Sequence, residues 1–337
     1  MNRLLFFSFF IIPSFLLAQR RDQYPILEKM NYFGTQFDDD FLFLGNRDEQ
    51  YTGGLEFEYI RKIENIKEKQ GLLNPFKNGQ RFISSSFGSY LHTPYNVSDS
   101  LIILNDRPFS SYMYLQSGYI AHSADYERRF SAEIYFGMMG GILPGKIQDA
   151  IHTIGDSPPT NGWENRIAKR RFIPNLKFNY QNTLINITGF DFISLRWLQA
   201  RTIWELQTGL YYNGISGGLL LMADNKRPIE KGKYKAIIPP NKGNDEGKKY
   251  RFRPYVTGEV RLVAQSTSLQ SLPWLYSPYI VTPDLINRVV WVGEIGAMIT
   301  HGRFHFAYKI NSHSREFKKY QPNWHTWAGI TLGWGFE

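Results

Sequence analysis

The stretch Phe37-Asp-Asp-Asp-Phe-Leu-Phe-Leu-Gly-Asn-Arg-Asp-Glu-Gln-Tyr-Thr-Gly-Gly-Leu-Glu-Phe-Glu-Tyr59 decides the fold of this 337-residue chain. It ends in a strict alternation, in which Leu55, Phe57 and Tyr59 share one face and two glutamates share the other. A period of two is the side-chain period of a β-strand. Buried glutamates are costly in a dry core, but they are stable where they line a wet barrel interior while the apolar face meets lipid. The stretch therefore predicts a transmembrane strand that follows a row of three aspartates.

The same alternation returns at the end of the chain, where apolar residues alternate with threonine and glycine over residues 328–336. Aromatic residues make up 16% of the chain, as in barrels with aromatic girdles at both membrane interfaces. The chain has no cysteine, so disulfides cannot stabilise it outside the cytosol. A closed sheet can, because every backbone group pairs with a neighbouring strand. We expect an all-β fold, an antiparallel transmembrane β-barrel.

The N-terminus has the pattern of a secretory signal peptide. Met1-Asn2-Arg3 is followed by a largely apolar run over residues 4–17 and then by Ala18-Gln19. A charged start, an apolar middle and a small residue near the cleavage point are typical of such signals. A membrane anchor is the alternative, but the run is shorter than the ~20 apolar residues of a spanning helix. We expect a signal peptide at residues 1–19 and a barrel domain at residues 20–337.

The formal net charge of +9 is a modest basic excess. It suits an anionic partner, of which lipopolysaccharide phosphates are one, and it is equally consistent with plain solubility. The chain shows no phosphate loop, dinucleotide fingerprint or nucleic-acid-binding motif. We therefore expect no nucleic-acid partner.

Counting strands places three polar motifs at one end of the barrel. The early strands are expected at residues 24–37, 52–61, 81–92, 111–121 and 127–139, and the later ones at 250–264, 288–300, 303–310 and 325–336. The number of strands between residues 170 and 222 stays open. If the first strand starts in the periplasm, strands one, three and five all end outside. The aspartate row, the loop at residues 106–108 and the loop around His152 then share one extracellular rim.

The third of these loops carries the candidate for proton transfer. Gln148 lies four residues before His152, so a short helix would place both on one face. Imidazole titrates near neutral pH and can take a proton from water, although a lone loop histidine is more often simply solvated. The row of Asp38, Asp39 and Asp40 supplies the hard oxygen ligands that Ca²⁺ prefers. A bound Ca²⁺ could polarise an ester carbonyl, and Thr52 could orient water or substrate through its hydroxyl.

Two other patterns have weaker functional readings. His301 and His305, interpreted as lying on one strand face, could bind zinc, but a polar barrel lining is the favoured interpretation. Gly214-Ile-Ser216-Gly-Gly218 matches the nucleophile-elbow pattern, which requires a strand-to-helix turn. Here it precedes three leucines in a β context, so we interpret it as a chance match.

Taken together, the motifs resemble the outer-membrane lipid A 3-O-deacylases, a calcium-dependent barrel family of Gram-negative bacteria. Four motifs carry the resemblance in the family's order and span nearly all of the mature chain: residues 38–54, Thr93-Pro94 with residues 106–109, residues 140–163, and residues 314–317. Asp39 stands where the family has asparagine. The family's glutamate just after the histidine has no clear match, and Asp156 is the candidate substitute.

The resemblance implies a barrel of twelve strands with its active site at the extracellular rim, in a protein of the bacterial outer membrane. It implies that His152 activates water and that Thr52, Asp39 and Asp40 serve the calcium and oxyanion environment. Three further residues lie in the matched motifs and are expected to contact substrate: Gln148, Arg107 and Trp163.

The sequence therefore predicts a monomeric, Ca²⁺-dependent ester hydrolase that removes the 3-position acyl chain of lipid A in the outer leaflet. Two alternatives stay open. One is a non-catalytic barrel, either lipopolysaccharide-binding or porin-like. The other is an outer-membrane phospholipase, which keeps the chemistry but changes the substrate to a glycerophospholipid.

Overall fold

The computed structural model describes residues 31–40, 42–43, 50–63, 75–76, 78–104, 106–154, 158–192, 195–225, 235–236, 250–275, 277, 279–318 and 323–336. The predicted signal peptide at residues 1–19 and Asp156 lie outside these ranges. Within them, every helix is too short or too polar to cross a membrane.

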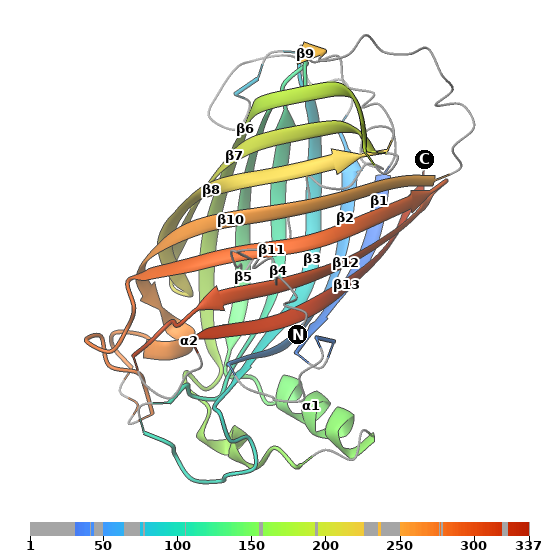
Figure 1. Cartoon of the computed structure of the whole chain (residues 1–337). Helices are drawn as coiled ribbons and strands as arrows, with labels where there is room; N and C mark the ends of the chain where they lie inside the picture. Colours follow the sequence, from blue (N-terminus) through green and yellow to red (C-terminus); the bar gives the residue numbers. More distant parts are fainter. Residues whose placement is uncertain are drawn as a thin grey trace, which may run out of the picture.

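The chain forms a closed antiparallel β-barrel of twelve strands (Figure 1). The strands are β1 (Asn31–Asp39), β2 (Gln50–Lys62), β3 (Gln80–Thr93), β4 (Ser110–His122), β5 (Arg128–Met139), β6 (Arg171–Phe192), β7 (Leu195–Gly209), β8 (Tyr212–Asp224), β10 (Tyr250–Ser266), β11 (Val289–His301), β12 (Phe304–Ser314) and β13 (Trp324–Phe336). Each strand pairs with its neighbours along the chain, and the pairing of β1 with β13 closes the ring. A two-residue piece, β9 (Lys235–Ala236), runs parallel to β6. The predicted fold class and strand number are confirmed.

The alternation that predicted the barrel is confirmed in β2. The three apolar residues at positions 55, 57 and 59 are 38–41% exposed, whereas Glu56 and Glu58 are 7% and 2% exposed. In β13, Leu332 and Trp334 are exposed while Thr331 is buried. Ala328 departs from the pattern, because it is fully buried at the start of the run. The outer wall is thus apolar and the inner face polar, as a lipid-embedded barrel requires.

The region that sequence patterning left open contains three strands, β6, β7 and β8. The interpretation that His301 and His305 lie on one strand face is wrong. His301 ends β11 and His305 lies in β12, so the two sit on different strands joined by a turn at Gly302. His301 is exposed, whereas His305 is fully buried in the lumen and near the Thr300 hydroxyl. They do not share a strand face.

Paired charges fill the barrel interior. The Lys177 ammonium lies 3.4 Å from the Glu133 carboxylate and 3.9 Å from that of Glu205. The Asp224 carboxylate lies between Arg251 and Arg253, at 2.7 Å and 3.0 Å. Buried charges are tolerated where they are paired and hydrogen-bonded. The polar residues of the inner face therefore bind one another between neighbouring strands.

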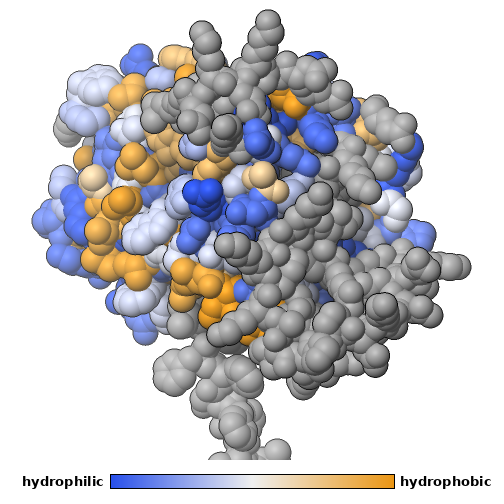
Figure 2. Space-filling view, turned by 90° about the horizontal axis from the view of Figure 1, so that it is seen from above, coloured by the Kyte–Doolittle hydropathy of each residue, from blue (hydrophilic) through white to orange (hydrophobic). Residues whose placement is uncertain are grey.

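Strands β1, β3 and β5 end at the same edge of the barrel, as the pairings Asp39–Gly53, Gln50–Thr93 and Tyr112–Met139 show. The helices α1 (Leu143–Ile154) and α2 (Thr267–Gln270) and the 3₁₀ helix η3 (Asn161–Asn165) also lie at this edge, which we call the α1 rim (Figure 1). Figure 2 looks onto the opposite end, where hydrophilic and hydrophobic residues are mixed among the described residues. The predicted convergence of three motifs on one rim is thus seen in the strand directions.

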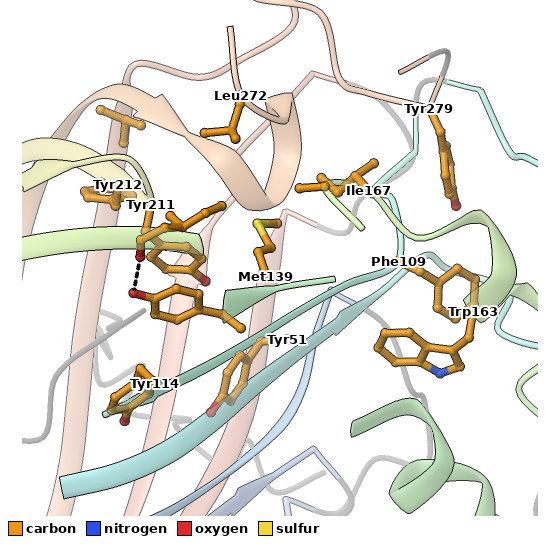
Figure 3. Packing of buried hydrophobic residues seen from close by; sticks show 14 of the residues in the cluster. Tyr51, Phe109, Tyr114, Met139, Trp163, Ile167, Tyr211, Tyr212, Leu272 and Tyr279 are labelled. Atoms are coloured by element: carbon orange, nitrogen blue, oxygen red, sulfur yellow. Dashed lines mark hydrogen bonds between the residues drawn. The ribbon is translucent and has the colours of Figure 1, made fainter. Parts of the chain in front are cut away.

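A cluster of buried, largely aromatic residues packs inside the barrel near the α1 rim (Figure 3). Tyr112 stacks on Tyr211 with ring centroids 4.0 Å apart, and Tyr51 packs on Trp327 at 4.9 Å. These residues come from β4, β2, β13 and the turn between β7 and β8, so the cluster crosses the barrel from wall to wall. Such packing leaves little room for a water-filled channel at this level.

Candidate functional site

The loop after β5 folds into α1, as the spacing of Gln148 and His152 predicted. Pro144 stands in the first turn, where its missing N–H leaves no helical bond unmade. Gln148 and His152 are 5% and 6% exposed and lie on the buried face of the helix. The helix packs against β3 at the α1 rim.

The imidazole of His152 is held in one orientation by the backbone. Its Nδ1 lies 2.5 Å from the carbonyl oxygen of Pro158. A carbonyl oxygen can only accept, so Nδ1 carries the proton and donates to it. In this tautomer the lone pair is on Nε2, which is the nitrogen able to accept a proton in a reaction.

Gln148 and Trp163 contact each other directly. The indole Nε1–H of Trp163 donates to the Gln148 Oε1 over 2.9 Å. Gly145 lies beneath the indole ring, where a Cβ atom would come within 2.6 Å of it, so only glycine permits this approach. Phe109 packs on the other side of Trp163 at 5.2 Å (Figure 3). These contacts fix α1 against η3 and the loop after β3.

Thr52 sits at a bulge in β2. The pairing with β3 passes from Tyr51–His92 to Gly53–Leu91, which leaves Thr52 as the extra residue. Its hydroxyl lies 2.5 Å from that of Thr93, and both residues are buried. Thr93 belongs to the second motif, so the bulge joins two motifs at the α1 rim.

The three aspartates do not act as one group. Asp38 belongs to the inner face, where the Gln36 amide donates to it at 2.7 Å and the Lys309 ammonium lies 3.5 Å away. Asp39 ends β1 opposite Gly53, and Asp40 follows it, with both residues buried. The described side chains contain no group of three acidic, histidine or cysteine residues placed to hold a metal ion. On these residues alone the fit to Ca²⁺ is incomplete, since Asp38 is engaged by an ammonium group.

Arg107 joins three motifs below the rim. It is fully buried, its Nε donates to the Gln50 Oε1 over 2.9 Å, and its guanidinium forms an ion pair with Glu316. Tyr279 donates from its hydroxyl to the Arg107 carbonyl at 3.4 Å. This placement favours a role in holding the loops of the rim together over direct contact with a substrate.

Burial governs the ionisation of this loop. It lowers the pKa of Arg107 to about 10, so the guanidinium stays charged at neutral pH. It raises the pKa of the neighbouring Asp106 carboxyl, opposed by hydrogen bonds from the backbone N–H groups of Tyr95 and Arg107. The Tyr95 amide reaches Asp106 over 2.8 Å. A charged arginine in this position must keep its partner Glu316.

Three residues that build the rim had no role assigned from the sequence: Gln50, Thr93 and Glu316. All three stand inside the quoted motifs, and that was the available signal. Gln50 adopts a φ of +68°, which is rare for a residue other than glycine. His152 and the aspartates lie at the same rim. The described contact of His152 is with Pro158, and those of Asp38 are with Gln36 and Lys309.

Comparisons with known proteins identify the family. No curated protein sequence matches the chain. LpxR from Salmonella typhimurium has a similar structure, with a TM-score of 0.68 at 15% identity, covering 90% of this chain and 100% of that chain. The β domain of the Bordetella autotransporter BrkA matches at a TM-score of 0.45 and 7% identity, over 91% and 98% of the two chains. At these identities the likeness shows the barrel fold alone. The family model described as outer membrane protein LpxR matches residues 4–336, and the chain therefore belongs to the LpxR family of outer-membrane proteins.

Proposed function

We propose that the protein is a lipid A deacylase that hydrolyses the 3-position acyl ester of lipid A at the extracellular surface of the outer membrane. Membership of the LpxR family and the four ordered motifs support the substrate and the reaction. The observation that carries the chemistry is the buried imidazole of His152, held at the α1 rim by Pro158.

His152 is the general base of this proposal. With Nδ1–H bonded to a carbonyl, Nε2 takes a proton from water while the water oxygen bonds to the ester carbonyl carbon. The tetrahedral intermediate then collapses, the bond from the acyl carbon to the sugar oxygen breaks, and Nε2 returns its proton to that oxygen. The products are a free fatty acid and a lipid A with one free hydroxyl group.

The rest of the site positions these groups. The contact between Gln148 and Trp163 and the packing of Phe109 hold α1, and therefore His152, against the rim. The paired hydroxyls of Thr52 and Thr93 offer donors at the same rim. Gln148 and Trp163 act here as positioning residues.

Ca²⁺ remains part of the proposal as a prediction. The family resemblance implies Asp39 and Asp40 as its ligands, whereas Asp38 is engaged by Gln36 and Lys309. A cation bound there would polarise the ester carbonyl. Among the described residues no complete set of metal ligands is present, so the proton transfers proposed above involve His152 and not a metal ion.

The packed lumen bears on the porin-like alternative. The aromatic cluster inside the barrel and the paired interior charges support an enzyme over an open pore. The phospholipase alternative keeps the same general base and differs only in the ester that it accepts. The choice between these functions rests on the product formed.

Purified protein in detergent, supplied side by side with lipid A and with a labelled phospholipid, separates these functions. The proposal predicts release of the 3-position acyl chain from lipid A, detected by mass spectrometry, and an intact phospholipid. Release of fatty acid from the phospholipid alone would establish the phospholipase. No release from either lipid by folded protein, with Ca²⁺ present, would leave the non-catalytic barrel.

A further inference from the structure

The helix α1 buries two polar side chains and exposes three large apolar ones. The buried face carries Gln148 and His152, at 5% and 6% exposure. Leu143, Ile147 and Ile151 are 52%, 50% and 42% exposed. A helix of a water-soluble domain shows the opposite arrangement, with its apolar stripe turned toward the core. This inversion is the unusual feature of the rim.

The three exposed residues form one continuous surface. Their spacing of four residues places them one above another along the helix, and we call this surface the α1 stripe. Lys146, Asp149 and Thr153 are also exposed, and on the helical wheel they fall on the opposite side of the exposed face. An apolar stripe beside an exposed lysine is the pattern of a helix that lies in a membrane interface.

The α1 stripe continues the lipid-facing wall of the barrel. Phe136 and Met138 of β5 are 48% and 44% exposed on the outer face. Four residues after β5, Leu143 begins α1. The helix lies against β3 at the end of the barrel (Figure 1). Only four residues of chain therefore separate the exposed apolar residues of β5 from the start of the α1 stripe.

We propose that α1 is an interfacial helix, with the α1 stripe inserted among the acyl chains of the leaflet at the α1 rim. Lys146 then extends toward anionic headgroups, while Thr153 faces water. The buried face with Gln148 and His152 is held by this insertion at the level where acyl esters begin. That consequence rests on the proposed function, whereas the insertion itself does not.

The absence of cysteine allows a direct test by single-site labelling. Ile147→Cys and Thr153→Cys are each coupled to a polarity-sensitive fluorophore, and the folded proteins are placed in phospholipid vesicles. Both positions are exposed, so neither substitution removes core packing, and they differ in the face that they report. We expect the Ile147→Cys probe to be quenched by spin-labelled acyl chains and protected from iodide. The Thr153→Cys probe should show the reverse.

Equal iodide quenching at both positions, without quenching by the lipid-borne spin label, would overturn the inference. These readouts need no hydrolysis, so a protein without deacylase activity but with a lipid-protected Ile147→Cys probe would retain the interfacial helix and lose only the proposed function. A third variant, Ile147→Asn, tests the consequence for the site. It should reduce hydrolysis of lipid A in vesicles several-fold while leaving hydrolysis in detergent micelles unchanged, and equal rates in vesicles would contradict that role.

Discussion

Replacing Glu316 by glutamine should lower the free energy of unfolding by about 3 kcal/mol, the low end of the cost of breaking a buried ion pair. The change keeps the shape of the side chain and one acceptor oxygen, but it removes the negative charge that faces Arg107. Because the guanidinium is fully buried and its pKa of about 10 keeps it charged, the variant leaves a buried cation without its counter-ion.

Two neighbours of the ion pair bear on the size of this loss in stability. The Gln50 amide oxygen still accepts from Arg107 Nε at 2.9 Å, which limits the loss. His313 lies 3.8 Å from the Glu316 carboxylate, beyond hydrogen-bond distance, so the expected loss comes from the Arg107 pair. A matched control is Glu164→Gln. Glu164 is 82% exposed and lies 3.9 Å from Arg166, and exposed pairs contribute about 0–1 kcal/mol.

Urea titration of the protein folded in phospholipid vesicles, followed by tryptophan fluorescence, measures both variants. The account predicts a large loss for Glu316→Gln and almost none for Glu164→Gln. Combining Glu316→Gln with Arg107→Met should cost less than the sum of the two single changes, since the second removes the stranded charge. A loss below about 1 kcal/mol for Glu316→Gln would refute the assignment of this pair as the tie between the rim loops.

Two further changes probe the helix and the cation. Trp163→Phe removes the N–H that donates to Gln148. Because a buried acceptor is left unpaired, the free energy of unfolding should fall by about 1–3 kcal/mol. Amide hydrogen exchange should become faster in α1 but not in β13. Unchanged exchange in α1 would contradict the positioning role of Trp163. Chelation of Ca²⁺ should abolish ester hydrolysis, and added Ca²⁺ should restore it. Asp40→Asn should raise the Ca²⁺ concentration required for activity more than Asp38→Asn does, because Asp38 forms an ion pair with Lys309. Full activity in chelator would remove Ca²⁺ from the proposal.

Local alternation was sufficient to predict most of the barrel. It predicted β2 and β13 closely, because one face of each strand meets lipid and the other lines a polar lumen. It failed to count the strands between residues 170 and 222. The turn between β7 and β8 consists of Leu210 and Tyr211, which pack into the aromatic cluster and carry none of the polar turn residues that mark a boundary.

The position of the candidate-site motifs at one rim could be predicted from the sequence, but most of their side-chain contacts could not. Strand parity placed the motifs at one rim, and the four-residue spacing predicted the face shared by Gln148 and His152. The partner of Arg107 lies 209 residues away in sequence, so no local pattern could reveal it. The aspartate row was treated as one cluster, yet consecutive strand residues point to opposite faces, and Asp38 accordingly faces Lys309 in the lumen.

The central claim is that His152 is the base that cleaves the 3-position ester of lipid A. It is tested most directly by mass spectrometry of lipid A from a Gram-negative host that makes the wild-type chain, His152→Ala, or His301→Ala. His301 is an exposed histidine at the far end of the barrel and serves as the matched control. We predict lipid A that lacks the 3-position acyl chain with the wild type and with His301→Ala. With His152→Ala the chain should be retained, since loss of a general base slows hydrolysis by about 10²–10⁴-fold. Identical acylation in all three, with each protein folded in the outer membrane, would contradict the account.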